Sequence, residues 1–213
     1  TLSSEDRWNE YYDVILANPP FFSPTGGIQP HARFGLQSTR AEVLFVDYIM
    51  EHLKPTGRAG IIVPEGIIFQ TGNAYKTLRK KLVEFCLVGV ISLPAGVFQP
   101  YSGVKTSILI LNKEFNQKSD SIFFAKVEND GFSLGAQRTP TSKNDLPEVT
   151  QNFSDFTHFS NEEFAEHSVS KTEILASNDI GLSFSRYQKS ERLNSETSFI
   201  PIGEVCNVFN GST

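Results

Sequence analysis

The stretch DVILANPPFF (residues 13–22) indicates how this chain begins to fold. The near-continuous apolar run Tyr12–Ala17 predicts a strand that is covered on both faces, as in a parallel sheet. The strand ends on a side-chain amide, two residues without a backbone donor and an aromatic ring (Asn18, Pro19, Pro20 and Phe21). In doubly wound folds, ligands bind at the carboxyl ends of the strands, so these residues are the first candidates for a site.

Strand-like and helix-like segments continue to alternate up to residue 112. Thr39 and Glu42 have the spacing of a capping box and predict the start of a buried helix, which Pro55 and Gly57 end. We expect a second strand in AGIIVPEG, a helix over 74–85, a third strand in LVGVISL and a fourth in VKTSILILN. The loop before the fourth strand is too short for a crossover helix, so the last two strands should form an antiparallel hairpin that caps one edge of the sheet.

The pattern weakens after residue 112. SIFFAKV predicts one more strand, and the polar stretch 132–170 predicts much loop, with a short helix near 161–167. We therefore expect three parts: catalytic-domain residues 1–131, an extension over 132–190, and the opening of a further domain over 191–213. The expected class is α/β, with parallel strands, helices and a closing antiparallel hairpin.

The composition, charge and cysteine content argue against several classes of protein. A net charge of −5 disfavours a nucleic-acid binder that works by charge alone. Cys86 and Cys206 lie in apolar surroundings without a Cys/His cluster, so we expect neither a disulfide framework nor a metal site. No signal peptide or membrane-spanning run is apparent, and a cytoplasmic location is expected.

The motif after the first strand suits one kind of chemistry. The Asn18 amide oxygen and the Pro19 carbonyl are two rigidly held acceptors for an exocyclic amino group with two hydrogens. Accepting both hydrogens draws the delocalised lone pair of such a nitrogen towards a tetrahedral shape and aims it at an electrophile. Phe21 offers a flat face on which a planar base can stack.

These residues resemble the catalytic motif of amino-methyltransferases that act on adenine N6 in DNA. IIVPEGIIFQTGNAYKTLRKKLVE, GVISLPAGVFQPYSGVKTSILILNK and NDLPEVTQNFSDF are similar to the modification subunit of type I restriction-modification systems. The resemblance implies a Rossmann-like, S-adenosylmethionine-dependent DNA methyltransferase that works on a flipped adenine without a metal. It implies that Asn18 and Pro19 grip the amino group, Pro20 shapes the loop and Phe21 stacks the base, with Asn18 and Pro20 also near the cofactor.

The resemblance also implies partners and a missing part. In this family the glycine-rich cofactor loop lies upstream of the motif, yet only residues 1–11 precede the first strand. We therefore expect a fragment that lacks its cofactor-binding half and is inactive alone. IPIGEVCNVFNGST is similar to the start of a target-recognition domain. The implied partners of this bacterial or archaeal protein are DNA, a specificity subunit or fused equivalent, and a restriction subunit.

Alternatives remain open at this point. The chain could be a non-catalytic scaffold that docks a specificity subunit, or part of a methyltransferase for glutamine or RNA amino groups. For other noted residues we favour structural roles over functional ones: a solvated loop for His31 and Arg33, core for Asp47 and Tyr48, an exposed helix face for Lys76, Arg79, Lys80 and Lys81, and core for the phenylalanines of 153–164. The loop segment 99–103 is as suited to closing the site as to being a plain hairpin connection.

Overall fold

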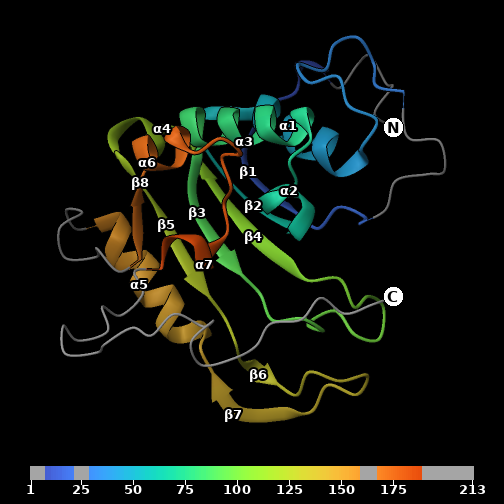
Figure 1. The fold of residues 1–213 in the computed structure, drawn as a ribbon, viewed down its shortest axis with the longest axis vertical. Helices are drawn as coiled ribbons and strands as arrows, with labels where there is room; N and C mark the ends of the chain where they lie inside the picture. The colour runs from blue at the N-terminus through green and yellow to red at the C-terminus, as the bar shows by residue number, and fades with distance from the viewer. Residues whose placement is uncertain (1–7, 22–28, 159–166, 189–213) are drawn as a thin grey trace, which may run out of the picture.

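A computed structural model describes residues 8–21, 29–158 and 167–188. Within these residues, eight strands form two sheets: β1 (Tyr12–Ala17), β2 (Leu53–Pro64), β3 (Leu87–Ser92), β4 (Thr106–Asn112), β5 (Ser121–Lys126), β6 (Asp130–Phe132), β7 (Pro140–Asn144) and β8 (Ser168–Ser170). Seven helices accompany them: α1 (Ala41–His52), α2 (Glu65–Phe69), α3 (Asn73–Phe85), α4 (Lys113–Lys118), α5 (Leu146–His158), α6 (Lys171–Ala176) and α7 (Phe184–Tyr187). The α/β class expected from the sequence is confirmed (Figure 1).

The large sheet has the strand order β1-β2-β4-β3-β5-β8, and β6 and β7 form a separate two-stranded sheet. β1 runs parallel to β2, β3 runs parallel to β5, and β4 is antiparallel to both of its neighbours. The antiparallel pairing of β3 and β4 confirms the expected hairpin. Its expected place at an edge is wrong, because β4 inserts between β2 and β3, and β5 and β8 continue the sheet beyond it.

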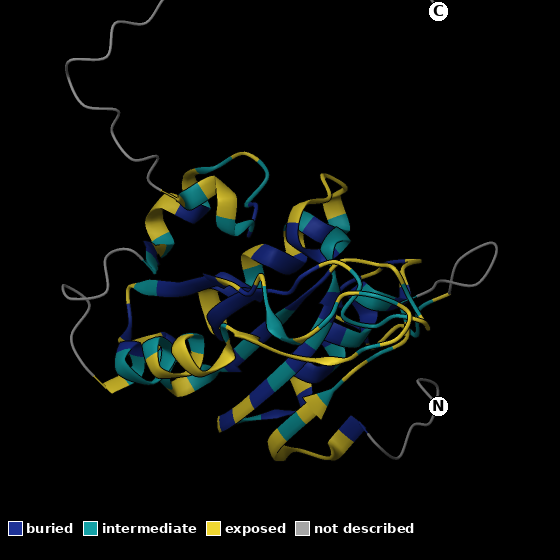
Figure 2. Cartoon of the chain, turned by 90° about the horizontal axis from the view of Figure 1, so that it is seen from below, coloured by how far each residue is buried: buried dark blue, intermediate teal, exposed yellow. Residues whose placement is uncertain are grey.

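Helices cover both faces of the sheet at its centre. Successive side chains of a strand point to opposite faces, so one strand contributes to both cores. Ile122 and Phe124 face a core formed with α1, α2, α3 and α6, whereas Phe123 and Ala125 face a second core against α5. The central strands are accordingly buried, while the outer surfaces of the helices are exposed (Figure 2).

β1 does not match the expected burial. Ile15 and Ala17 pack against the larger core, but Leu16 is 83% exposed and Val14 is 53% exposed. Among the described residues β1 is an edge strand with one bare face, so the prediction of a strand covered on both sides is wrong for this chain. An apolar run shows that both faces of a strand can be buried. Here no described segment covers the second face of β1.

Several local expectations also changed. α1 begins at Ala41 after Arg40 without a side-chain cap, so the Thr39 capping box does not form. α5, with 13 residues, occupies part of a stretch that was expected to be mostly loop. Phe153 and Phe156 of α5 pack in the second core, as expected for the aromatic stretch. The helix expected near 161–167 falls mostly outside the described residues, as does the whole of 191–213.

Candidate active site

The Asn18–Phe21 motif follows directly from β1, at the carboxyl end of the parallel strands. Asn18 and Pro20 are exposed, and Pro19 and Phe21 are half-buried. The parallel register places Ala17 beside Ile61, so the motif lies next to the last residues of β2. The sequence therefore placed these residues at the correct end of the sheet, although their roles remain predictions.

The loop between β3 and β4 reaches the same end of the sheet. In the antiparallel register Thr106, the first residue of β4, pairs with Pro64, the last residue of β2. Within this loop Phe98 meets Phe21 edge to face, with ring centroids 5.8 Å apart at 71°. Such an arrangement is favourable for two aromatic rings and limits the orientations that Phe21 can adopt. The sequence had pointed to neighbouring residues 99–103 and had missed Phe98.

Glu65 is a further polar group at this end that the sequence analysis did not single out. Its backbone N–H donates to the Lys105 carbonyl at 3.2 Å, and Ser107 Oγ donates to its Oε1 at 3.0 Å. Lys105 Nζ lies 3.7 Å from its other carboxylate oxygen. These contacts tie the end of β2 to the start of β4. An acidic residue immediately after a buried strand was the signal that could have found it.

The Asn18 amide is available to a ligand. Across residues 8–21, 29–158 and 167–188, no other side chain or backbone group hydrogen-bonds to it. The two prolines that follow restrict the backbone at the end of the strand, so the Asn18 side chain projects from a fixed point of the chain. Together with the half-buried ring of Phe21, it can accept hydrogens from a flat, amino-bearing group and stack on it.

Of the basic residues that were considered as phosphate contacts, Lys80 stays exposed on α3, as expected, whereas several others contact groups within the chain. Arg33 lies over the Trp8 ring at 5.3 Å, and the ring of His31 is 6.1 Å from the same tryptophan. Lys81 forms an ion pair with buried Asp47. The placing of Arg79 on an exposed helix face is wrong, because its side chain is completely buried.

Arg79 is buried because its guanidinium is surrounded by backbone acceptors. It donates to the carbonyls of Ile67, Gln70, Asp179 and Ile180 at distances from 2.6 to 3.0 Å. Burial lowers the pKa of Arg79 to about 10, which still leaves the group charged at neutral pH. The helical periodicity of 3.6 residues could not reveal this role, because two of the four acceptors lie about 100 residues away in the chain.

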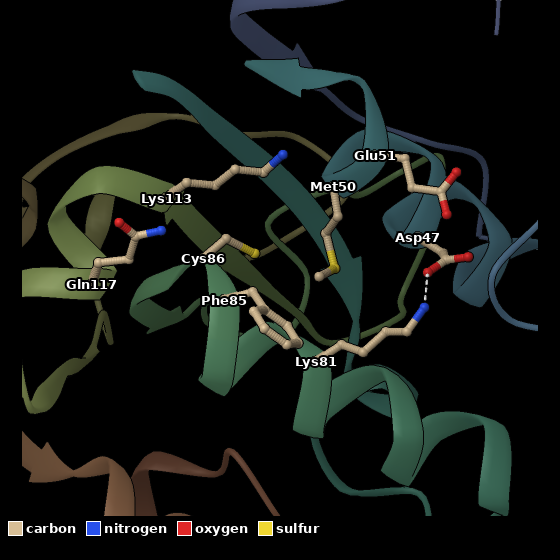
Figure 3. A pocket seen from close by; sticks show the side chains of 8 residues that line it. All are labelled: Asp47, Met50, Glu51, Lys81, Phe85, Cys86, Lys113 and Gln117. Atoms are coloured by element: carbon tan, nitrogen blue, oxygen red, sulfur yellow. Dashed lines mark hydrogen bonds and ion pairs between the residues drawn. The ribbon is translucent and has the colours of Figure 1, made fainter. Parts of the chain in front are cut away.

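A pocket of about 360 Å³ lies at the opposite, amino end of the sheet, between α1, α3 and α4 (Figure 3). Lys81 reaches across its mouth to Asp47 Oδ1 at 3.2 Å, and the Leu36 N–H donates to the other carboxylate oxygen at 3.0 Å. Burial raises the pKa of the Cys86 thiol to about 12, so the thiolate needed of a nucleophile is scarce at neutral pH. The polar groups here hold helices together, and the pocket is far from the motif in the topology.

The described residues contain no group of three or more His, Cys, Asp or Glu side chains that could hold a metal ion. Likewise, none of the helices in this part of the chain is long and apolar enough to cross a membrane.

The architecture and the motif together define the class of protein. A mixed sheet whose edge strand β1 ends in Asn-Pro-Pro-Phe, with β4 inserted antiparallel between β2 and β3, matches the fold of a solved type I methyltransferase subunit. The chain belongs to the N-6 DNA Methylase family, which matches residues 1–196.

Similar proteins carry the same description. The chain is 38% identical over 119 residues to the methylase subunit of the type I restriction enzyme EcoEI from Escherichia coli, covering 55% of this chain and 24% of that subunit. It is 29% identical over 211 residues to the MpnII methylase subunit from Mycoplasma pneumoniae, covering 90% of this chain and 37% of the relative. The chain therefore spans well under half the length of these relatives.

Solved structures show the same fold. A chain from a type I restriction-modification system, studied for its complex assembly and conformational transition, superposes with a TM-score of 0.66 at 27% identity, covering 92% of this chain and 41% of that one. The M protein of the type I restriction enzyme EcoKI matches with a TM-score of 0.64 at 22% identity, covering 85% and 44%, and this likeness concerns the fold alone.

Proposed function

We propose that this chain is the adenine-binding part of a type I modification subunit, which transfers a methyl group from S-adenosylmethionine to adenine N6 in DNA. The observation that supports this most directly is the exposed Asn18 amide at the end of β1, in the same short motif as Phe21, whose ring meets Phe98. An amide acceptor next to a flat aromatic surface suits a flipped adenine. Family membership supports the same reaction class.

In this proposal each residue of the motif has a distinct task. The Asn18 oxygen and the Pro19 carbonyl accept the two N6 hydrogens, which aims the nitrogen lone pair at the methyl group. When bound, S-adenosylmethionine would supply that methyl group on a sulfonium, so that the N–C bond would form as the C–S bond broke and N6 would then release one proton. Pro20 fixes the path of the loop, and Phe21, supported by Phe98, stacks the base.

This chain fits only part of the cofactor site. In this proposal Asn18 and Pro20 contact the cofactor near its methyl group, as the family resemblance implies. The described residues place no glycine-rich loop beside the motif, and Glu65 at the end of β2 is already bonded to Ser107 and Lys105. Because the chain spans well under half the length of its curated relatives, we propose that the methionine and ribose ends are held by polypeptide outside this chain, which also covers the bare face of β1.

The proposed partners follow from the same assignment. DNA is the substrate, a specificity subunit or fused target-recognition domain selects the site, and a restriction subunit completes the system, in the bacterial cytoplasm. The relatives are named as subunits of type I restriction enzymes, which supports an assembly of this kind.

A substitution in the full-length protein, purified with its specificity component, tests the proposal. Asn18→Ala should lower the rate of tritium transfer from labelled S-adenosylmethionine to unmethylated bacterial DNA by at least about a hundredfold, because the lone pair is no longer aimed. DNA affinity should change by less than about threefold, because base contacts are a small part of it. Asn178→Ala, at another exposed asparagine, is the matched control.

The product identifies the reaction. Digestion of the labelled DNA should yield N6-methyldeoxyadenosine. Label in protein glutamine or in RNA, and none in DNA, would support a methyltransferase for those amino groups instead. Full DNA methylation by the Asn18→Ala protein would contradict the assigned role. A full-length wild-type protein that binds a specificity subunit but transfers no methyl group would favour the scaffold alternative.

A further inference from the structure

The β6–β7 sheet, with the residues that join its strands, forms an arm over residues 130–144. It follows β5, and the parallel register of Lys126 with Ser92 brings it out at the carboxyl end of the large sheet, the end that carries the motif. The arm projects beyond that end, below β5 in Figure 1. All five residues of β7 are exposed. A two-stranded ribbon with little core is barely stable alone, so its attachments determine where it lies.

Arg138 is the main polar attachment of this arm. Its Nη2 forms an ion pair with Asp130, its guanidinium lies 5.4 Å from the Phe132 ring centre, and its side chain is only 20% exposed. Its Nη1 donates to the Val97 carbonyl at 3.0 Å. The last bond joins the arm to the loop between β3 and β4, because Val97 lies in that loop.

The Val97 carbonyl, which accepts the bond from Arg138, is one residue from Phe98, whose ring lies at the candidate site. Phe98 follows Val97 and meets Phe21 edge to face. The arm also faces the loop at Gly96, whose φ of +87° suits glycine and whose missing Cβ would lie 3.8 Å from the Leu134 carbonyl. Contacts thus run from Arg138 through Val97 to Phe98 and on to Phe21.

We propose that Arg138 is a positioning residue, which holds Phe98 against Phe21 by fixing the loop from the arm. The inference rests on the proposed function, in which Phe21 stacks the target base. An arginine suits the task because its planar fork serves Asp130 and the Val97 carbonyl at once, whereas a lysine ammonium has no fixed fork. The arm thereby acts on the reaction without touching the substrate.

A double-mutant cycle in the full-length enzyme, with its specificity component, tests the inference. Arg138→Met should lower kcat about tenfold, since small misplacements of the binding surface are costly, while the KM for DNA changes by less than about twofold. In a Phe98→Ala background the same substitution should change kcat by less than about twofold, because the ring that Arg138 positions is gone. Arg186→Met, which removes another arginine–aspartate pair, is the matched control and should leave kcat unchanged.

A second measurement needs no activity. Gln99, Tyr101 and Ser102 donate backbone hydrogen bonds within the loop, to the carbonyls of Gly96 and Phe98. Their amides should exchange with deuterium at least about threefold faster in Arg138→Met, with the amides of β3 unchanged. Arg138→Lys should recover part of the protection and part of kcat, and it replaces the methionine variant if that protein fails to fold.

The outcomes separate this inference from the proposed function. Unchanged loop exchange, or an equal loss of kcat with and without Phe98, would overturn the role of Arg138 even in an active enzyme. If the wild-type protein methylates no DNA, the proposed function fails, and the exchange measurement still decides whether Arg138 fixes the loop.

Discussion

The two edges of the large sheet are built differently. At one edge, the chain itself covers β5 and β8: Phe123 packs against α5, and Val169 joins the core that includes Ile174 of α6. At the other edge, β1 leaves Val14 and Leu16 mostly exposed, although it leads into the candidate site. The closed edge buries apolar side chains within this chain, whereas the open edge leads to the candidate site. The open apolar face is suited to burial by further polypeptide, as expected of a site shared with another segment.

The largest effect is expected from replacing Arg79, whose hydrogen bonds to Asp179 and Ile180 hold the segment at 179–187. Arg79→Met should lower the free energy of unfolding of this chain by about 3 kcal/mol, because the four carbonyls that it bonds lose their donor. Urea unfolding followed by circular dichroism measures the change. Lys80→Met, at an exposed neighbour on α3, is the control and should cost less than about 0.5 kcal/mol. A loss below about 1 kcal/mol for Arg79→Met would show that the segment at 179–187 is held by other contacts.

A smaller effect concerns the start of α5, which covers the closed edge. Backbone N–H groups of Asn129 and Glu128 donate to the Asp145 carboxylate, each at 2.8 Å, and they hold its pKa below the ordinary value of 3.8. Because the pKa is lowered in the folded state, this stabilisation is fully present above 3.8 and is lost as the pH falls through the lower folded value.

The pH dependence of unfolding checks this sign. Wild type should be more stable than Asp145→Asn at pH 7, and the difference should shrink as the pH falls below about 4. Asp155→Asn, farther along α5, is the matched control. A gap between wild type and Asp145→Asn that is constant from pH 7 to pH 2 would mean that the charge of Asp145 contributes nothing.

The local elements were predictable where the pattern was local. The strands β2 to β5 and the helix α3 follow from apolar runs and a 3.6-residue period, and the β3–β4 hairpin follows from a connection too short for a helix. The strand order was harder to predict, because sequence spacing does not say that β4 lies between β2 and β3. α5 was missed because the polar composition of its stretch was taken to indicate loop, although Leu146, Val149, Phe153 and Phe156 follow the spacing of one helix face.

The candidate site was likewise predictable only where its residues are neighbours in the sequence. Asn18, Pro19, Pro20 and Phe21 form a contiguous motif, so their common location followed from the sequence. Phe98 meets Phe21 only through the fold. Arg79 illustrates the same limit, since a charged residue in a row of lysines gives no local sign that its acceptors are distant carbonyls.

The smallest effect expected in this chain lies at the open edge, and the prediction compares this chain with the full-length protein. In this chain Leu16→Ser should change the free energy of unfolding by less than about 0.5 kcal/mol, because Leu16 is 83% exposed. In the full-length protein the same substitution should cost about 2 kcal/mol, the usual value of burying a leucine side chain, if further polypeptide covers β1 as proposed. Leu109→Ser, in the core of both forms, should cost several kcal/mol in each and serves as the control. Equal small effects of Leu16→Ser in both forms would mean that the bare face of β1 stays open in the whole protein, and that the rest of the cofactor site is built without covering it.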